Sequence, residues 1–346
     1  MFQRLFHFIL ADSLMSSSSY ILFLNSLGDH IVTYLGIFVV IAGILGESLN
    51  IIVFLSLRTF RQSSCAFHLT VMSMVNICQL LSSLFSRIIP AELDIDWSKT
   101  SAFYCKFRFY LYQVSAMISL TCLCLAVIDQ YLATCVSLYW QRLASIRVAH
   151  RAAAVNVSIW IIYNIPVFVY YNYIVSSKNH QAICVINDQV FTQFNNYANR
   201  FLVGKFLPIC TTCIFGVLTL RNIKNMARRT LPVVRRALEK QLTIMVLLQA
   251  VVMLFTNIPY IITYLLQASL DLTDYPVISA QIQFAFSVTM CFLYMSFAVS
   301  MIYENLDVMN DLFRYLDVIL HLLLGIESIS STIEICPVRY SLQSMS

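Results

Sequence analysis

Seven long apolar stretches constrain the fold of this chain more than any other feature. Each holds about 20 or more predominantly apolar residues, the length that an α-helix needs to cross the hydrocarbon core of a bilayer. The stretches are residues 31–57, 66–89, 106–133, 152–175, 198–220, 242–266 and 277–303. Because the loops between them are mostly short, we predict an all-α membrane protein whose seven transmembrane helices form one bundle.

The composition agrees with a membrane protein and excludes several other classes. Of the 346 residues, 59% are hydrophobic and 11% are charged, whereas an ordinary soluble domain carries roughly a quarter charged residues. A soluble chain could not bury so much apolar surface. The sequence contains no P-loop, zinc-ligand cluster or nucleophile–base pair, so we predict no enzyme activity, no cofactor, no metal site and no nucleic-acid partner.

The positive charges indicate an orientation. Lys and Arg are concentrated in the first, third and fifth loops, above all in the stretch from Arg221 to Lys240. Such loops stay in the cytoplasm. We therefore predict a multi-pass protein of the cell membrane with residues 1–30 as an extracellular tail, residues 31–303 as the seven-helix domain and residues 304–346 as a cytoplasmic tail.

Cysteine placement gives a second constraint on the outer face. Of the 11 Cys, only Cys105 and Cys184 fall outside the spans on the predicted extracellular side, where disulfides form and persist. Cys105 stands at the outer end of the third span, and Cys184 stands in the loop between the fourth and fifth spans. Either the two form a bridge that holds this loop over the mouth of the bundle, or they remain two unpaired thiols.

A three-residue motif at the inner end of the third span carries a family resemblance. Asp129, Gln130 and Tyr131 stand one membrane-crossing length after Cys105 and resemble the Asp-Arg-Tyr motif of rhodopsin-like G-protein-coupled receptors. The chain is most similar to divergent invertebrate peptide-type or orphan members of that family. Softer matches occur in the family's order along residues 31–303: Trp97, Trp160, Pro208, Pro259 and Tyr303.

The resemblance implies a cytoplasmic switch, and this chain departs from its usual form. In the family, the arginine of the motif pairs with an acid on the sixth span, and activation releases it. Here Gln130 replaces the arginine, while Glu239 stands where the family places the acid. Gln130 and Glu239 would form only a weak clamp, or Glu239 belongs to a solvated loop end. Tyr303 ends the seventh span as the family's tyrosine does.

Polar residues inside the spans are a further signal, because they are expensive in a bilayer and usually functional or paired. Asn76 replaces the acid of the family's intramembrane polar pocket, and Ser119 matches another residue of that pocket. Glu47 lies in the first span. It either supplies the acid that Asn76 lacks or is protonated and hydrogen-bonded.

The resemblance places a ligand pocket between the outer halves of the third, fifth, sixth and seventh spans. Tyr112 occupies the position where amine receptors carry an acid, which argues against an amine ligand. Two cations, Arg200 and Lys205, lie in or near this cavity. At helical spacing Arg200 shares the cavity face with Gly204, while Lys205 lies about 100° beyond Gly204. Arg200 would meet a carboxylate of the ligand, or it extends toward the lipid headgroups. The other pocket candidates are Gln113, Asn257 and Tyr260.

Three functions follow from these observations. The first is a receptor that transmits the binding of an extracellular ligand, a peptide by family resemblance, to a heterotrimeric G protein, with the lipid bilayer as its surroundings. The second is a decoy or scavenger receptor of the same fold that no longer couples, because Asn257, Val299 and Ser300 also depart from the family's motifs. The third is a membrane transporter, for which Glu47 and Asn76 give thin support.

Overall fold

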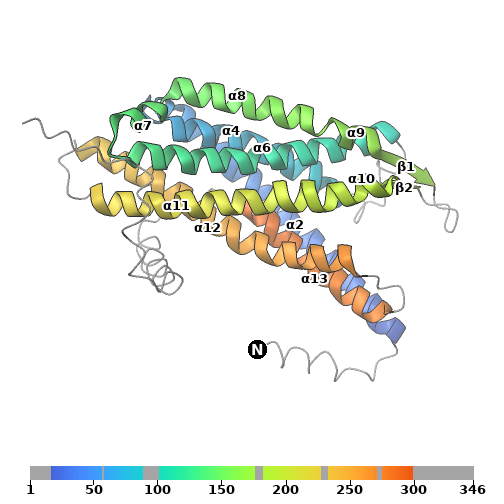
Figure 1. Ribbon diagram of the computed structural model, residues 1–346. Helices are drawn as coiled ribbons and strands as arrows, with labels where there is room; N and C mark the ends of the chain where they lie inside the picture. Colours follow the sequence, from blue (N-terminus) through green and yellow to red (C-terminus); the bar gives the residue numbers. More distant parts are fainter. Residues whose placement is uncertain are drawn as a thin grey trace, which may run out of the picture.

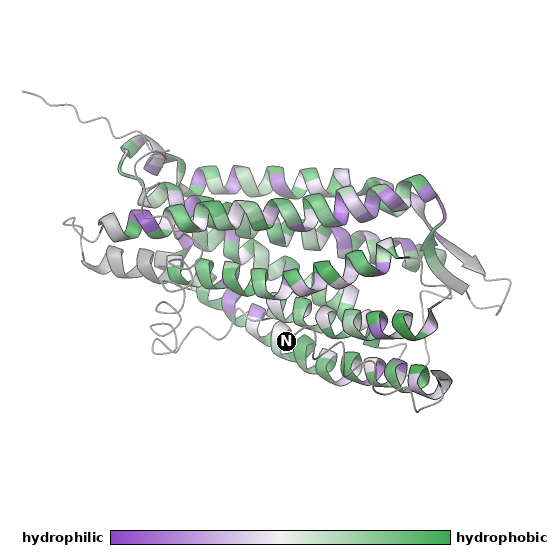
Figure 2. Cartoon of the chain, turned by 60° about the horizontal axis from the view of Figure 1, so that its bottom comes forward, coloured by the Kyte–Doolittle hydropathy of each residue, from purple (hydrophilic) through white to green (hydrophobic). Residues whose placement is uncertain are grey.

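The computed structural model describes residues 17–56, 58–88, 101–175, 182–226, 233–270 and 275–298. Within these residues, seven helical segments are long and apolar enough to cross a membrane, so the predicted seven-helix membrane bundle is confirmed. Side chains such as Phe38, Ile162 and Phe255 are more than half exposed on the outer faces of the bundle, as expected where helices face lipid. Figure 2 shows that hydrophobic residues predominate along the long helices.

The elements follow one another in a simple order. The first half of the chain forms α2 (Ser17–Ser56), α3 (Arg58–Arg61), α4 (Ser64–Gln79), the π-helix η1 (Leu80–Phe85), α6 (Ala102–Thr134), α7 (Leu138–Leu143), α8 (Ile146–Tyr163) and α9 (Ile165–Tyr170). The second half forms β1 (Tyr171–Val175), β2 (Ala182–Ile186), α10 (Gln189–Gln193), the π-helix η3 (Phe194–Phe206), α11 (Leu207–Met226), α12 (Val233–Ser269) and α13 (Pro276–Ala298).

Two apolar clusters hold the bundle together. One surrounds α6 and includes Leu69, Val127 and Val246, which come from α4, α6 and α12. The other joins α2, η1 and α13 through residues such as Val39 and Leu84. In Figure 1, α2 and α13 lie side by side and diverge from the other helices. The α6 helix therefore lies at the centre of the larger cluster and contacts most of its neighbours.

The bundle has two distinct ends. In Figure 1 the strands β1 and β2 lie at one end of the long helices and α7 at the other; we call these the hairpin end and the α7 end. The fourth span breaks near the hairpin end, where α8 stops at Tyr163 and α9 begins with Pro166 in its first turn. Proline lacks the N–H that continues a helix. In contrast, α12 runs through Pro259 without ending.

The structure corrects the predicted end of the fourth span. Residues 171–175 belong to β1 rather than to the helix, and they pair antiparallel with β2 in the register Tyr171 to Ile186 and Tyr173 to Cys184. The segment is rich in aromatic and β-branched residues, which favour strands. Hydropathy alone could not separate this strand from the apolar helix before it.

Several other helices begin earlier than predicted: the fifth span begins with α10 at Gln189 and the sixth with α12 at Val233. The first helix begins at Ser17 rather than at residue 31, so part of the segment predicted as a tail is helical. This extension packs on α13, where a Cβ at Gly28 would lie 3.6 Å from the Phe284 ring. The remaining predictions for residues 1–16 and for residues 299–346, Val299, Ser300 and Tyr303 among them, lie outside the described residues.

Candidate functional site

A cavity of about 40 Å³ lies inside the bundle toward its hairpin end. Three elements form its wall: α6, the π-helix η3 and α12. Its polar and charged lining residues are Tyr112, Gln113, Arg200, Lys205, Tyr260 and Tyr264. Four of these were predicted for the pocket from sequence, and the structure brings them together.

Lys205 lines the cavity together with Arg200, although α-helical spacing predicts an angular offset between the two residues. On an α-helix, residues five apart lie about 140° apart around the axis. The segment from Phe194 to Phe206 is instead a π-helix, in which backbone hydrogen bonds join residues five apart. This wider turn brings Arg200 and Lys205 close to one face.

Arg200 is held by aromatic side chains from two directions. Its Nη2 donates a hydrogen bond to the Tyr171 hydroxyl at 3.0 Å, and its guanidinium carbon lies 5.9 Å from the centre of the Tyr264 ring. The Tyr264 hydroxyl in turn donates to Asn196 Oδ1 at 2.7 Å. Among the residues that the structure describes, no group accepts a hydrogen bond from the buried guanidinium Nε. Within the described part of the chain, Arg200 therefore keeps Nε as a spare donor.

Asn257 reaches the site through Lys205. The Lys205 Nζ donates to Asn257 Oδ1 at 2.6 Å and lies 5.4 Å from the centre of the Tyr260 ring. The Asn257 amide also donates to the Met253 carbonyl at 2.7 Å. Asn257 thus fixes the ammonium group against α12 and does not line the cavity itself.

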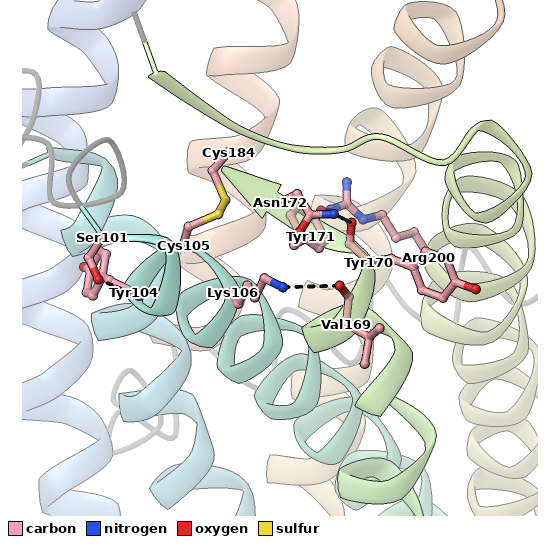
Figure 3. The surroundings of a disulfide bond; sticks show 10 residues. All are labelled: Ser101, Tyr104, Cys105, Lys106, Val169, Tyr170, Tyr171, Asn172, Cys184 and Arg200. Carbon is pink, nitrogen blue, oxygen red and sulfur yellow. Dashed lines mark hydrogen bonds between the residues drawn. A yellow bond between two sulfur atoms is a disulfide. The ribbon is translucent and has the colours of Figure 1, made fainter. Parts of the chain in front are cut away.

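A disulfide closes the hairpin end. Cys105 at the start of α6 is bonded to Cys184 in β2, with their Cα atoms 5.8 Å apart, so the bridged alternative from sequence is confirmed. Figure 3 shows the bridge beside Tyr171 and Arg200. The Tyr171 ring stacks on Phe109 of α6 with ring centres 4.3 Å apart. The disulfide and this stack together hold the hairpin against α6.

Tyr171 links the hairpin to the cavity. Its ring is buried, and this burial raises the pKa of the hydroxyl above its ordinary value of about 10, while the nearby Arg200 charge acts in the opposite direction. Tyr171 is therefore neutral and accepts the hydrogen bond from Arg200. Sequence analysis missed it, because residues 171–175 were assigned to the fourth span.

The three intramembrane polar residues predicted from sequence form one chain. Ser119 Oγ donates to Asn76 Oδ1 at 2.5 Å, and Asn76 Nδ2 donates to Glu47 Oε1 at 2.7 Å. Glu47 and Asn76 are completely buried. These contacts join α2, α4 and α6 between the cavity and the α7 end, because Ser119 stands between Gln113 and Gln130 along α6. The protonation of Glu47 stays a prediction.

The α7 end carries the motif residues of α6. The Asp129 carboxylate accepts a hydrogen bond from Ser64 Oγ at 2.6 Å, and the side-chain Oε1 of Gln130 accepts one from Thr243 Oγ1 at 2.7 Å. The Tyr131 ring packs edge-on against Phe215 of α11. All three motif residues are thus buried against other helices. Their contacts tie α6 to α4, α12 and α11.

Glu239 belongs to the backbone of α12, but its side chain lies outside the described residues, so the predicted contact with Gln130 stays a prediction. Thr243 stands one turn further along α12 and makes the contact that the structure describes. Sequence analysis missed Thr243 and Tyr264. Tyr264 could have been found, because it follows Tyr260 by one helical turn and shares its face.

Comparisons with known proteins do not identify a family for this chain. No protein-family model matches this chain, and no curated protein sequence matches it. The fold defines a multi-pass membrane protein with a seven-helix bundle. Its candidate site is a cation-lined cavity beneath a hairpin that a disulfide holds in place.

Proposed function

We propose that this protein is a rhodopsin-like G-protein-coupled receptor of the cell membrane. In this proposal an extracellular ligand, a peptide, binds at the hairpin end, and a heterotrimeric G protein binds at the α7 end. The motif of Asp129, Gln130 and Tyr131 supports the proposal through its resemblance to that family. The receptor catalyses no reaction and acts by shifting the bundle between two conformations.

One structural observation carries the proposal. The α6 helix places Tyr112 and Gln113 in the cavity wall and Gln130 at the α7 end. The α12 helix does the same with Tyr260 in the cavity wall and Thr243 at the α7 end. A ligand in the cavity therefore contacts the same two helices that meet at the other end through Gln130 and Thr243. Such shared helices can transmit a displacement across the membrane.

Two features support an orientation with the α7 end in the cytoplasm. Basic residues lie on the elements of the α7 end, as is typical of cytoplasmic loops: Arg58, Arg61, Arg142, Arg147 and Arg151. The disulfide lies at the opposite end, where an oxidising compartment would preserve it. We therefore assign the hairpin end to the outside of the cell.

Thr243→Ala tests the proposal. Loss of one hydrogen bond between neutral groups weakens the contact between α6 and α12 by about 1 kcal/mol, which is about fivefold in the ratio of two conformations. For a receptor, we expect basal nucleotide exchange by added heterotrimeric G proteins to rise by up to that factor in membranes that carry the variant.

Thr256→Ala is the matched control. Among the described residues, the Thr256 hydroxyl bonds only to carbonyls of its own helix, Val252 and Met253, so its removal should leave the exchange rate unchanged. Exchange no faster than in membranes without the protein, for wild type, Thr243→Ala and Gln130→Arg alike and with normal surface expression, would contradict a coupling receptor.

A binding protein that does not couple is the second candidate, and Gln130 favours it. This residue is a neutral amide at the position where the family uses a cation to engage the G protein. Gln130→Arg separates the two candidates. If wild type gives no nucleotide exchange above background and Gln130→Arg does, the protein is a non-coupling binder on an intact fold. Exchange in wild type would support the receptor.

A further inference from the structure

We propose that the cavity binds a carboxylate group of the ligand between Arg200 and Lys205. This inference rests on the proposed receptor function, since it names the chemical class that the ligand site takes. It is carried by four properties of the described residues: the charges in the cavity wall, the common face of the two cations, their spare donors and the size of the cavity.

The first property is an excess of positive charge inside the bundle. Arg200 and Lys205 both line the cavity, and their partners are the neutral side chains of Tyr171 and Asn257. Within the described ranges, neither cation has a carboxylate partner. Charged groups removed from water are strongly destabilised unless an opposite charge and hydrogen bonds compensate them. An anion in the cavity would supply that compensation.

The second property is the common face of the two cations. The π-helix brings Arg200 and Lys205 to the same side of η3. Gly204 between them allows α6 to approach closely, because a Cβ at that position would lie 3.0 Å from Met117 Cε and 3.1 Å from the Asn199 carbonyl oxygen. Close packing by α6 keeps the cavity narrow. Both cations can therefore reach one small group.

The third property is the set of unused donors. In the described ranges, the buried Arg200 Nε has no hydrogen-bond partner. Lys205 has three N–H donors, of which Asn257 accepts one. A carboxylate carries two oxygens that accept such bonds, and charge-assisted bonds of this kind are stronger than neutral ones. The chemistry of the cavity wall thus matches a carboxylate better than an amide or an ammonium group.

The fourth property is the size of the cavity. A volume of about 40 Å³ holds about three water molecules, since one water needs roughly 10–15 Å³. A whole peptide cannot enter this space, but a terminal group of three heavy atoms can. This carboxylate is either an acidic side chain or the C-terminus of a peptide, because both groups have the same size and charge.

The first experiment measures propionate binding to the purified full chain in detergent. The thermal unfolding midpoint is followed as sodium propionate is added, with propionamide plus sodium chloride at equal concentration as the neutral comparison. We expect a saturable rise with propionate and none with propionamide. This measurement needs no G protein, so its failure is distinct from a failure of the proposed signalling function.

Variants locate the propionate site. Arg200→Gln should abolish the saturable rise, and Lys205→Met should weaken propionate binding about tenfold or more, because each removes one charged donor. Lys106→Gln is the matched control: Lys106 is a cation at the hairpin end whose Nζ lies 3.4 Å from the Val169 carbonyl oxygen, away from the cavity wall. Its loss should leave binding unchanged.

Three results would overturn the inference: equal effects of propionate and propionamide, unchanged binding in Lys205→Met, or an equal loss in Lys106→Gln. If Arg200→Gln fails to fold because the Tyr171 contact is lost, the comparison of Lys205→Met with Lys106→Gln decides alone. Neither lysine substitution removes the hydrogen bond to Tyr171, because that bond comes from Arg200. Both lysine variants should therefore keep the hairpin in place.

Two pairs of N-acetylated tripeptides, used as competitors of propionate, distinguish the two sources of the carboxylate. The first pair contains no acidic side chain and differs only in a free or amidated C-terminus. The second pair is amidated and differs only in Asp or Asn at the central position. Stronger competition by the free acid indicates a C-terminal carboxylate, and stronger competition by the Asp peptide indicates an acidic side chain. If neither pair discriminates, a peptide carboxylate is overturned as the ligand group.

Discussion

The hairpin end holds two partly buried cations and the α7 end holds a buried carboxyl group, and all three contact neutral partners. At the hairpin end, Arg200 and Lys205 contact Tyr171 and Asn257. At the α7 end, the carboxyl group of Asp129 accepts a hydrogen bond from Ser64. In the part of the chain that the structure describes, none of these three charged side chains forms an ion pair.

This comparison indicates how the two ends divide their tasks. A cation without an ion-pair partner is a natural place for an anionic group from outside the chain. The α7 end instead joins α6 to α12 through Gln130 and Thr243, a neutral contact that contributes about 1 kcal/mol. A contact of that strength can be broken by a modest share of ligand-binding energy. The hairpin end is therefore suited to binding and the α7 end to switching.

The largest expected effect comes from opening the disulfide. Cys184→Ser removes a link across 79 residues, and we expect it to lower the free energy of unfolding by about 2–4 kcal/mol. Hydrogen exchange should rise in residues 171–175 and 182–186 and stay unchanged around Gln130. Cys78→Ser, which changes an exposed free cysteine, is the control. Equal increases at both ends would mean that the two ends are not separable.

A smaller effect is expected from the polar chain between the two ends. Asn76→Ala leaves Glu47 and Ser119 without their shared partner, which should lower the free energy of unfolding by about 2–3 kcal/mol. Ser119→Ala removes only the contact to Asn76 and should lower it by about 1 kcal/mol. Chemical unfolding in detergent measures both values. Equal losses in the two variants would show that the Glu47–Asn76 contact adds nothing.

The smallest effect is a pH dependence at the hairpin end. Burial raises the pKa of Tyr171 above about 10, so its stabilising contribution is complete below pH 10 and is lost as the pH rises through the raised value. Wild type should therefore lose more unfolding free energy above pH 10 than Tyr171→Phe does. The measurement is the unfolding midpoint as a function of pH. Parallel curves for the two proteins would contradict the assigned role of Tyr171.

Much of the candidate site could be predicted from sequence, and the misses have physical causes. Glu47, Asn76 and Ser119 were identified because polar residues stand out within apolar spans, and the structure joins them. Helical spacing assumes an α-helix and therefore separated Lys205 from the face of Arg200 and Gly204, whereas η3 is a π-helix in which both cations line the cavity. Thr243 gave no signal, since a threonine in a long helix is common and its partner lies far away in the sequence.

The sequence by itself determined the membrane class, the seven spans and the two cysteines of the bridge. Apolar length, charge placement and cysteine position are local properties, and the bilayer and the redox compartment act on them directly. Only the tertiary structure decided which cations share the cavity, that Tyr171 caps Arg200, and that Gln130 meets Thr243. Those contacts depend on helix geometry and on packing between segments far apart in the chain, which no local pattern records.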